Sequence, residues 1–193
     1  MRFALVLATV ACLATSAQAE VRWQLDCKTN AIGTITVKGA EGAGNYAYLT
    51  LTVTNNTGRD VPCSLGIWAE TDVVGRTYRG AFDPVVKETI ERRTGKSYKT
   101  LTEARAEKLA NGASIDLLVS LGKIDPNVDV LDVNIMGLVD RVYRDKGKTL
   151  VEDKVLELHV TRPGDEFQRQ NDLLKLDSSK WKLLEPAKEL KRA

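Results

Sequence analysis

Two neighbouring segments of the chain alternate between apolar and polar side chains. In residues 46–54 every second residue is apolar, and tyrosine or threonine stands between these positions. A period of two is typical of a β-strand with one buried face, so a half-buried strand is predicted here. The Asn- and Gly-rich residues 55–60 predict a turn. In the strand predicted after it, the apolar positions are Val61, Cys63, Leu65, Ile67 and Ala69.

Five further segments have the composition of β-strands. They are residues 32–38, 76–82, 114–121, 128–138 and 149–161. Short strands separated by turn residues predict a mostly β protein, an antiparallel β-sandwich that we expect residues 31–82 and 113–161 to build. The charged tail, residues 163–193, is too apolar for a purely disordered segment, and we expect it to lie along the domain or to contain a short helix.

Residues 83–112 interrupt the strand pattern and are predicted to form a short helical insertion. Asp83 and Pro84 are a typical helix start, with aspartate as the N-cap and proline at the first helical position. Val86 and Ile90 share one face of this helix. Because an isolated helix of this length would be marginally stable, these two side chains are expected to contact the sandwich.

A second helix is predicted to begin at Thr100, because Thr100 and Glu103 fit a capping box. It would follow the end of the first helix at Gly95 and run to Ala110. The alternative for this segment is an extended chain that turns at the Asn-Gly pair of residues 111–112.

The turns of the chain resemble those of a known family. Three motifs carry the resemblance: the strand with its N-x-x-G-x-x-V turn from Tyr48 to Val61, Asp72-x-x-Gly75-x-x-Tyr78, and Leu109-Ala-Asn-Gly112. They are similar to motifs of exported immunoglobulin-like domains of bacteria, over residues 45–160. The resemblance implies an immunoglobulin-like β-sandwich with a binding, adhesion or accessory role, although fold alone does not decide function. The chain departs from the family pattern in residues 83–108 and in its long C-terminal tail.

Residues 1–19 have the layout of a cleavable signal peptide. Arg2 supplies a positive charge, residues 3–14 are almost entirely apolar, and Ala17 and Ala19 form a small-x-small cleavage site. The alternative of a membrane anchor is disfavoured, because a spanning helix needs about 20 apolar residues.

Cleavage after Ala19 would leave Glu20 at the N-terminus of the mature chain. A lipoprotein anchored through Cys12 is the second alternative, but the residues before this cysteine are a poor match to a lipidation site. The predicted organisation is therefore a signal peptide, a β-sandwich domain in residues 20–162 with the helical insertion, and a C-terminal extension in residues 163–193.

Two cysteines remain once the signal peptide has been removed. Cys27 and Cys63 form an even pair in an oxidising compartment, which predicts a disulfide between them. Two free buried thiols are the alternative. A redox-active pair is disfavoured, because the two positions are far apart in the sequence and do not form a C-x-x-C motif.

The charge balance excludes one class of partner. The chain carries 28 lysine and arginine residues against 26 aspartate and glutamate residues, a formal net charge of +2. Nucleic-acid-binding domains usually have a strong basic excess, so no nucleic-acid partner is predicted. No stretch after residue 19 is long and apolar enough to span a membrane. Together with the signal peptide, this predicts a periplasmic or secreted protein.

No catalytic, cofactor or metal constellation stands out in the sequence. His159, the only histidine, lies within a predicted strand, where a partly exposed position is favoured over a catalytic one. Zinc or copper would find few soft ligands. Residues 125–129 could offer aspartate oxygens to calcium, but they lack the spacing of an EF-hand loop, and a polar turn is favoured.

Two features are candidate partner surfaces. Trp68 lies on the opposite face of its strand from the apolar row, and exposed tryptophans often mark interfaces; the alternative is that the insertion or the tail covers it. Arg92, Arg93 and Lys96 form a basic cluster that could bind an anionic partner, although interleaved glutamates favour a solvated helix face.

The favoured functional hypothesis is an exported, non-enzymatic binding or interaction module with a protein or envelope partner. The alternatives are a periplasmic hydrolase with a carboxylate-based site and a structural accessory subunit of an envelope assembly. A pocket with two inward carboxylates would favour the hydrolase, whereas an exposed apolar patch around Trp68 would favour the other two.

Overall fold

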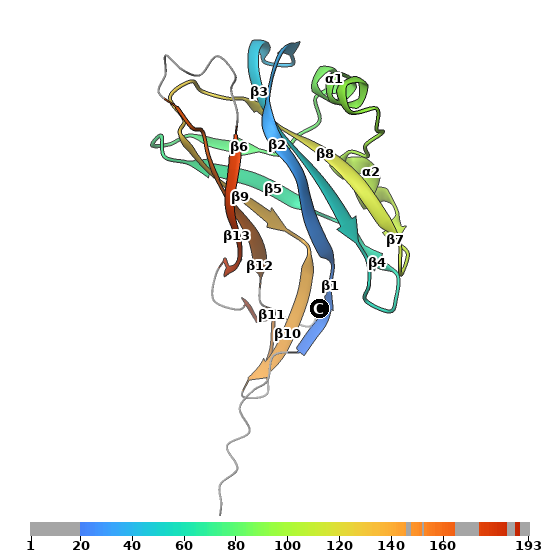
Figure 1. Ribbon diagram of the computed structural model, residues 1–193. Coiled ribbons are helices and arrows are strands. Elements are labelled where there is room, and N and C mark those ends of the chain that lie inside the picture. Colours follow the sequence, from blue (N-terminus) through green and yellow to red (C-terminus); the bar gives the residue numbers. More distant parts are fainter. Residues whose placement is uncertain (1–19, 146–147, 152, 165–173, 185–187, 190–193) are drawn as a thin grey trace, which may run out of the picture.

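The computed structural model describes residues 20–145, 148–151, 153–164, 174–184 and 188–189 (Figure 1). The predicted signal peptide lies outside the described residues. The strands are β1 (Glu20–Gln24), β2 (Asp26–Gly39), β3 (Gly42–Thr54), β4 (Val61–Pro62), β5 (Gly66–Thr71), β6 (Thr77–Arg79), β7 (Lys108–Leu109), β8 (Ser114–Lys123), β9 (Val130–Met136), β10 (Val139–Asp145), β11 (Lys148–Val151), β12 (Lys154–Thr161), β13 (Lys175–Leu183) and β14 (Lys188–Glu189). The helices are α1 (Pro84–Thr94) and α2 (Leu101–Ala106).

Two antiparallel sheets enclose the main hydrophobic core. One has the strand order β2-β3-β8, and the other has the order β13-β12-β9-β5-β6. Leucine, isoleucine and valine side chains from both sheets form one buried cluster between them. A smaller sheet, β1-β10-β11-β14, continues from the lower end of this pair, because β1 leads into β2 and β9 leads into β10 (Figure 1). The prediction of a mostly β, antiparallel protein is confirmed.

The alternation in the first predicted strand is confirmed in β3. Its apolar residues Ala47, Leu49, Leu51 and Val53 are all buried in the main core. The five apolar residues of the next segment are buried as well, but they do not lie on one continuous strand. The first part of the segment is β4, which pairs with β7, and the second part is β5, which pairs with β6 and β9. The prediction of a single strand is therefore wrong. The segment passes from one sheet to another, while the same apolar side chains stay buried.

Helix α1 agrees with its prediction from cap to cap. The Asp83 carboxylate accepts hydrogen bonds from the first-turn backbone N–H groups of Val85 and Val86, and Gly95 ends the helix in the left-handed region at φ 66°. Val86 and Ile90 are buried in a second hydrophobic cluster with side chains of β2, β3 and β8. Helix α1 therefore covers the outer face of the three-stranded sheet.

Helix α2 begins as predicted and ends early. The Thr100 side chain and the Glu103 side chain form both hydrogen bonds of the capping box. The helix ends at Ala106, not at Ala110, because the next residues pair with β4 as strand β7. The helix prediction is thus correct for residues 101–106, and the alternative of an extended chain is correct for the residues that follow.

Three sequence boundaries need correction. Strand β2 begins at Asp26, well before the predicted start at residue 32, and the predicted strand 149–161 is divided into β11 and β12. The tail supplies β13, which pairs with β12 along its whole length. The five-stranded sheet therefore includes part of the tail. This part lies along the domain, as one of the two expected arrangements had it, and forms a strand where the other expected a short helix.

Cys27 and Cys63 carry free thiols in the structure, so the predicted disulfide is not present in it. Cys63 is buried in the main core, as its place in the apolar row indicated, and Cys27 packs against the same core. Burial, with a smaller contribution from the negative charge of an ionised Cys63, raises the pKa of the Cys27 thiol to about 12.

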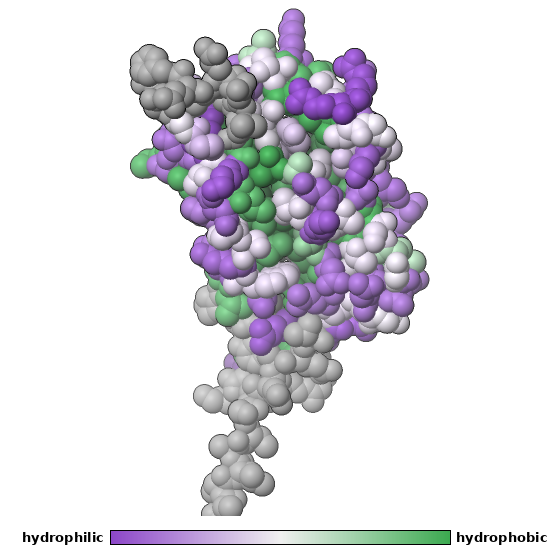
Figure 2. Space-filling model, in the orientation of Figure 1, coloured by the Kyte–Doolittle hydropathy of each residue, from purple (hydrophilic) through white to green (hydrophobic). Residues whose placement is uncertain are grey.

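One side of the sheet pair is open. The space-filling view shows hydrophobic surface between polar rims in the region where β2 and β13 lie side by side (Figure 2). On the opposite side, Ala81, the second residue after β6, bridges the two sheets, because the Ala81 and Ser120 backbones exchange two hydrogen bonds. Among the described residues, no helix is long and apolar enough to cross a membrane.

Candidate functional site

The outer face of the five-stranded sheet carries a dense group of polar side chains, here called the polar face. Ile67 and Ala69 of β5 point into the core, so the residues between and beside them, Trp68 and Glu70, point outward. The same alternation on β9 and β12 turns a second set of polar side chains to this side. The polar face consists of Trp68, Glu70, Arg79, Asp132, Asn134, Glu157, His159, Ser178, Lys180 and Lys182.

All of these side chains except Lys182 lie, together with Thr77, in two neighbouring rows across the sheet, because the residues within a row are direct cross-strand partners. The first row is Arg79, Trp68, Asn134, Glu157 and Lys180. The second row is Thr77, Glu70, Asp132, His159 and Ser178. Directly opposed side chains in an antiparallel sheet have Cβ atoms about 5 Å apart, so neighbours in a row interact.

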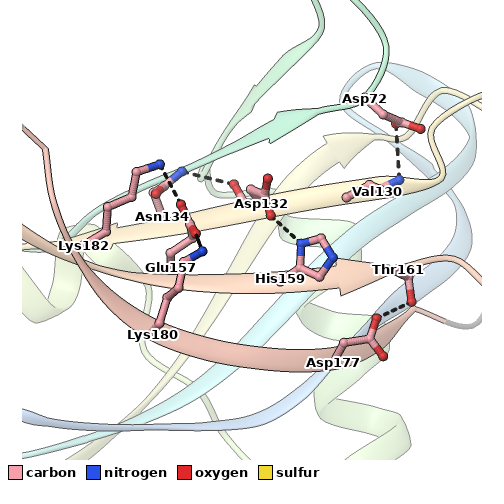
Figure 3. Close-up of polar contacts among 10 residues, drawn as sticks. All are labelled: Asp72, Val130, Asp132, Asn134, Glu157, His159, Thr161, Asp177, Lys180 and Lys182. Carbon is pink, nitrogen blue, oxygen red and sulfur yellow. Dashed lines mark hydrogen bonds and ion pairs between the residues drawn. The ribbon is translucent and has the colours of Figure 1, made fainter.

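Glu157 is the electrostatic centre of the polar face. Its carboxylate accepts a hydrogen bond from the Lys182 ammonium at 2.8 Å and forms an ion pair with the Lys180 ammonium at 2.9 Å (Figure 3). Only 5% of Glu157 is exposed, which is unusual for an outward-facing residue. The hydrogen bonds from Lys182 and then Lys180 lower the pKa of Glu157. The two lysines therefore hold a dehydrated carboxylate in place.

This arrangement predicts a pH-dependent stability. Because the pKa of Glu157 is lower in the folded than in the unfolded chain, its contribution is present above the unfolded pKa of about 4.3 and is lost as the pH falls through the folded value. We expect Glu157→Gln to lower the Tm by about 2–4 °C at neutral pH, and the difference from wild type to shrink below pH 4.

Thermal melts at both pH values check this prediction. Glu88→Gln is the matched control, because Glu88 is an exposed glutamate whose contact with Arg92 is 3.9 Å long. It should change the Tm very little at either pH. An equal Tm difference for Glu157→Gln at neutral and at acidic pH would contradict the assigned ion pairs.

Asn134 carries an unused hydrogen-bond acceptor at the middle of the first row. Its side-chain amide donates to the backbone oxygen of Asp132 at 3.1 Å, and the residue is 2% exposed. The Asn134 Oδ1 atom is buried and has no hydrogen-bond partner among the described residues. A buried acceptor without a partner costs about 1–3 kcal/mol, so this atom makes the polar face locally less stable.

Trp68 lies next to Asn134 on the neighbouring strand and is half-buried. Its indole N–H points at the Glu70 carboxylate, with a donor–acceptor distance of 3.4 Å. The outward position predicted for this residue is confirmed. Helix α1 packs on the other sheet, so this helix does not cover Trp68.

His159 sits on the open sheet face and not in a cleft. Its Nδ1 atom is 2.7 Å from Asp132 Oδ1, and both side chains are about two-fifths exposed, at 43% and 41%. Ser178 is its direct partner on the other neighbouring strand. The three residues thus have the order of a catalytic Ser-His-Asp triad, but no hydrogen bond joins Ser178 to His159 in the described part of the chain.

Two hollows elsewhere contain carboxylates that form structural contacts. A hollow of about 350 Å³ beside α2 contains Glu103, which caps that helix, and Glu107, which pairs with a lysine at 3.7 Å. A second hollow, of about 640 Å³, contains Asp83, the cap of α1, and Asp125, which pairs with an arginine at 3.3 Å. Within the described residues, no group of three histidine, cysteine or acidic side chains could hold a metal ion.

The two candidate partner surfaces lie on opposite sides of the molecule. Arg92, Arg93 and Lys96 are exposed on and just after α1, which covers the three-stranded sheet, whereas Trp68 lies on the outer face of the five-stranded sheet. The core separates them, so one small contact cannot include both. Arg92 also faces Glu88, which agrees with the solvated helix face that the interleaved glutamates favoured.

Comparison with known proteins adds no assignment. No family model, no curated protein and no solved structure matches the chain.

Proposed function

We propose that the mature chain is an exported, non-enzymatic binding module of the cell envelope, and that its polar face around Trp68 contacts the partner. The scaffold in this proposal is an immunoglobulin-like β-sandwich. Its support is the turn pattern of residues 45–160 together with two antiparallel sheets around one core. The support for export is the signal-peptide pattern of residues 1–19.

The buried Asn134 Oδ1 atom beside Trp68 is the observation that carries this proposal. A polar outer face is ordinary for a β-sandwich. Here the Lys182–Glu157–Lys180 group fixes the neighbouring strand, and the unused acceptor lies next to a flat aromatic side chain. Tryptophan is among the residue types enriched in binding hot spots, and these cluster in well-packed parts of an interface.

The proposal predicts that the partner binds the polar face and not the basic cluster on α1. Tagged wild-type protein is purified from its native envelope, and the co-purified component is identified and then titrated against purified variants. We expect Trp68→Ala, and separately Asn134→Ala, to weaken its binding at least about tenfold, since truncated hot spots cost about 2 kcal/mol or more. Both variants should remain folded, as judged by circular dichroism.

The matched control is the triple variant Arg92→Glu/Arg93→Glu/Lys96→Glu. Its three positions are exposed, so it should bind as wild type does. It should stay folded with a slightly lower melting temperature, because acidic side chains in the last turn of α1 oppose the helix dipole and repel Glu88. Loss of the partner in the triple variant, with unchanged binding by Trp68→Ala, would move the binding site to α1 and refute the assignment to the polar face.

A hydrolase is the second candidate, and the Ser178, His159 and Asp132 order favours it over a two-carboxylate site. A nucleophilic serine would react with a fluorophosphonate probe, because such probes label activated serine hydroxyls. We expect no labelling of wild-type protein at Ser178, since its histidine neighbour lies on an open sheet. Labelling that disappears in Ser178→Ala and His159→Ala would replace the binding proposal by the enzymatic one.

A further inference from the structure

A small hollow lies between the start of β5 and helix α2, on the side of the molecule where the Ala81–Ser120 bridge joins the two sheets. Strand β6 pairs only with Trp68–Glu70 of β5, so Gly66, at the start of β5, has no β6 residue opposite it. The hollow at this gap has a volume of about 280 Å³. It is here called the arginine hollow, and its main lining residues are Ile67, Arg79, Phe82, Leu101, Thr102 and Arg105.

Phe82 gives the arginine hollow an exposed aromatic wall. Its side chain is 57% exposed, although the backbone on both sides of it is fixed. Ala81, the residue before it, exchanges two hydrogen bonds with Ser120, and Asp83, the residue after it, caps α1. An apolar group that covers the Phe82 ring would therefore gain hydrophobic contact without first ordering a loop.

Two arginines supply the charge of the arginine hollow. Within the described part of the chain, Arg79 of β6 and Arg105 of α2 are the only charged residues that line it, and both are exposed. Neither forms an ion pair or a side-chain hydrogen bond with another described residue. Arg105 lies one helical turn after Leu101, on the same side of α2. The hollow thus combines apolar side chains with two guanidinium groups, which bind carboxylates through parallel N–H groups.

The acidic residues nearest along the chain have other contacts. Glu103 follows Thr102 directly, but its carboxylate caps α2 and it lines the separate hollow beside that helix. Asp83 follows Phe82, and its buried carboxylate accepts three backbone hydrogen bonds, two of them at the start of α1. Neither carboxylate contacts Arg79 or Arg105. The positive charge of the hollow is therefore not neutralised by these two neighbours.

We propose that the arginine hollow binds a small carboxylic acid with an apolar body. The carboxylate is held by Arg79 and Arg105, and the apolar body lies against Phe82 and Leu101. A water molecule occupies about 30 Å³ in the liquid, so a hollow of about 280 Å³ has room for about nine heavy atoms. A short fatty acid has this size, whereas a strand or a folded partner is much larger.

The test is a titration of the full mature protein with heptanoate, followed in two-dimensional amide NMR spectra. We expect saturable shifts at Gly66, Gly80 and Thr102, which line the hollow, and none at Val74, which lies in the β5–β6 turn. Heptanamide has nearly the same shape without the charge. It should bind about tenfold more weakly, because it cannot form charge-assisted hydrogen bonds. Acetate should not saturate the site at the same concentrations, because it lacks the apolar body.

Two pairs of variants separate charge from shape. Thr102 is exposed in the first turn of α2, where an acidic side chain is favourable, so Thr102→Glu should fold. Its carboxylate should compete for the arginines and abolish heptanoate binding, whereas Thr102→Gln, which is uncharged and of the same size, should still bind. Arg105→Gln should weaken heptanoate binding about tenfold. Arg93→Gln, at an exposed arginine of α1, should leave it unchanged.

The apolar contact has its own variant. Phe82→Ala should weaken heptanoate binding, whereas Val74→Ala should not, since Val74 is 99% exposed in a turn that does not line the hollow. Arg79 also belongs to the polar face, but Trp68→Ala should leave heptanoate affinity unchanged, so this inference and the proposed function can fail independently. Equal affinity for heptanoate and heptanamide, or equal heptanoate affinity of Thr102→Glu and Thr102→Gln, would overturn the proposal.

Discussion

Gly137→Ala is expected to destabilise the protein by about 4 kcal/mol or more, or to prevent folding, because two independent costs meet at this residue. Gly137 joins β9 to β10 with φ at 89°, a conformation that L-residues with a side chain rarely adopt. An added Cβ atom would lie 2.2 Å from the backbone oxygen of Ser64. That oxygen belongs to the chain between β4 and β5 and cannot rotate away as a flexible side chain would.

Gly112→Ala separates the cost of a side chain at positive φ from the cost of the steric clash. Gly112 has a similar φ of 79°, but a Cβ atom there would meet nothing within 4 Å. Only the backbone cost remains, and we expect about 1 kcal/mol. Urea denaturation of both variants gives the comparison. Equal losses for the two would show that the Ser64 chain moves aside easily and that the close approach at Gly137 does not matter.

Local sequence signals predicted the local features of the fold. The period of two identified the buried face of β3, and the Asp83-Pro84 pair identified the start of α1, because caps and alternation depend only on neighbouring residues. Strand breaks were harder to predict. The apolar row from Val61 to Ala69 stays buried while its backbone changes partners, and no local pattern reports which strand a segment pairs with.

The candidate site was predictable only in part, because local sequence patterns do not report which strands pair. Trp68 was identified because its own strand shows which way it points. The sequence did not identify three other residues of the site, Asn134, Glu157 and Lys182. Their side chains come together only through the register of three strands that are distant in sequence. A charged residue at position 157, within an otherwise apolar run, was the one available signal. A buried charge is rarely tolerated without a partner, but the sequence does not say which lysine supplies it.

Oxidation of Cys27 and Cys63 to a disulfide, which is absent from the structure, is expected to give the second large effect. The structure contains both thiols in reduced form at the same core, with the pKa of Cys27 raised to about 12. If the chain is exported, we expect oxidation to join them, because the compartment favours disulfides. Closing a loop of this length should stabilise the protein by about 4 kcal/mol in the chain-entropy model, less any strain.

Protein purified without reductant from an oxidising compartment provides the measurement. Its unfolding free energy in urea should fall by about 2–5 kcal/mol when dithiothreitol is added. The Cys27→Ser/Cys63→Ser variant should not respond to dithiothreitol and should match the reduced protein more closely than the oxidised one. In the reduced native protein, the raised pKa of Cys27 should make alkylation at pH 8 slow, since the thiolate is the reactive form. Two thiols that alkylate fully once the unreduced protein is denatured would refute the bond and leave the free-thiol alternative, in which burial alone keeps both cysteines unreactive.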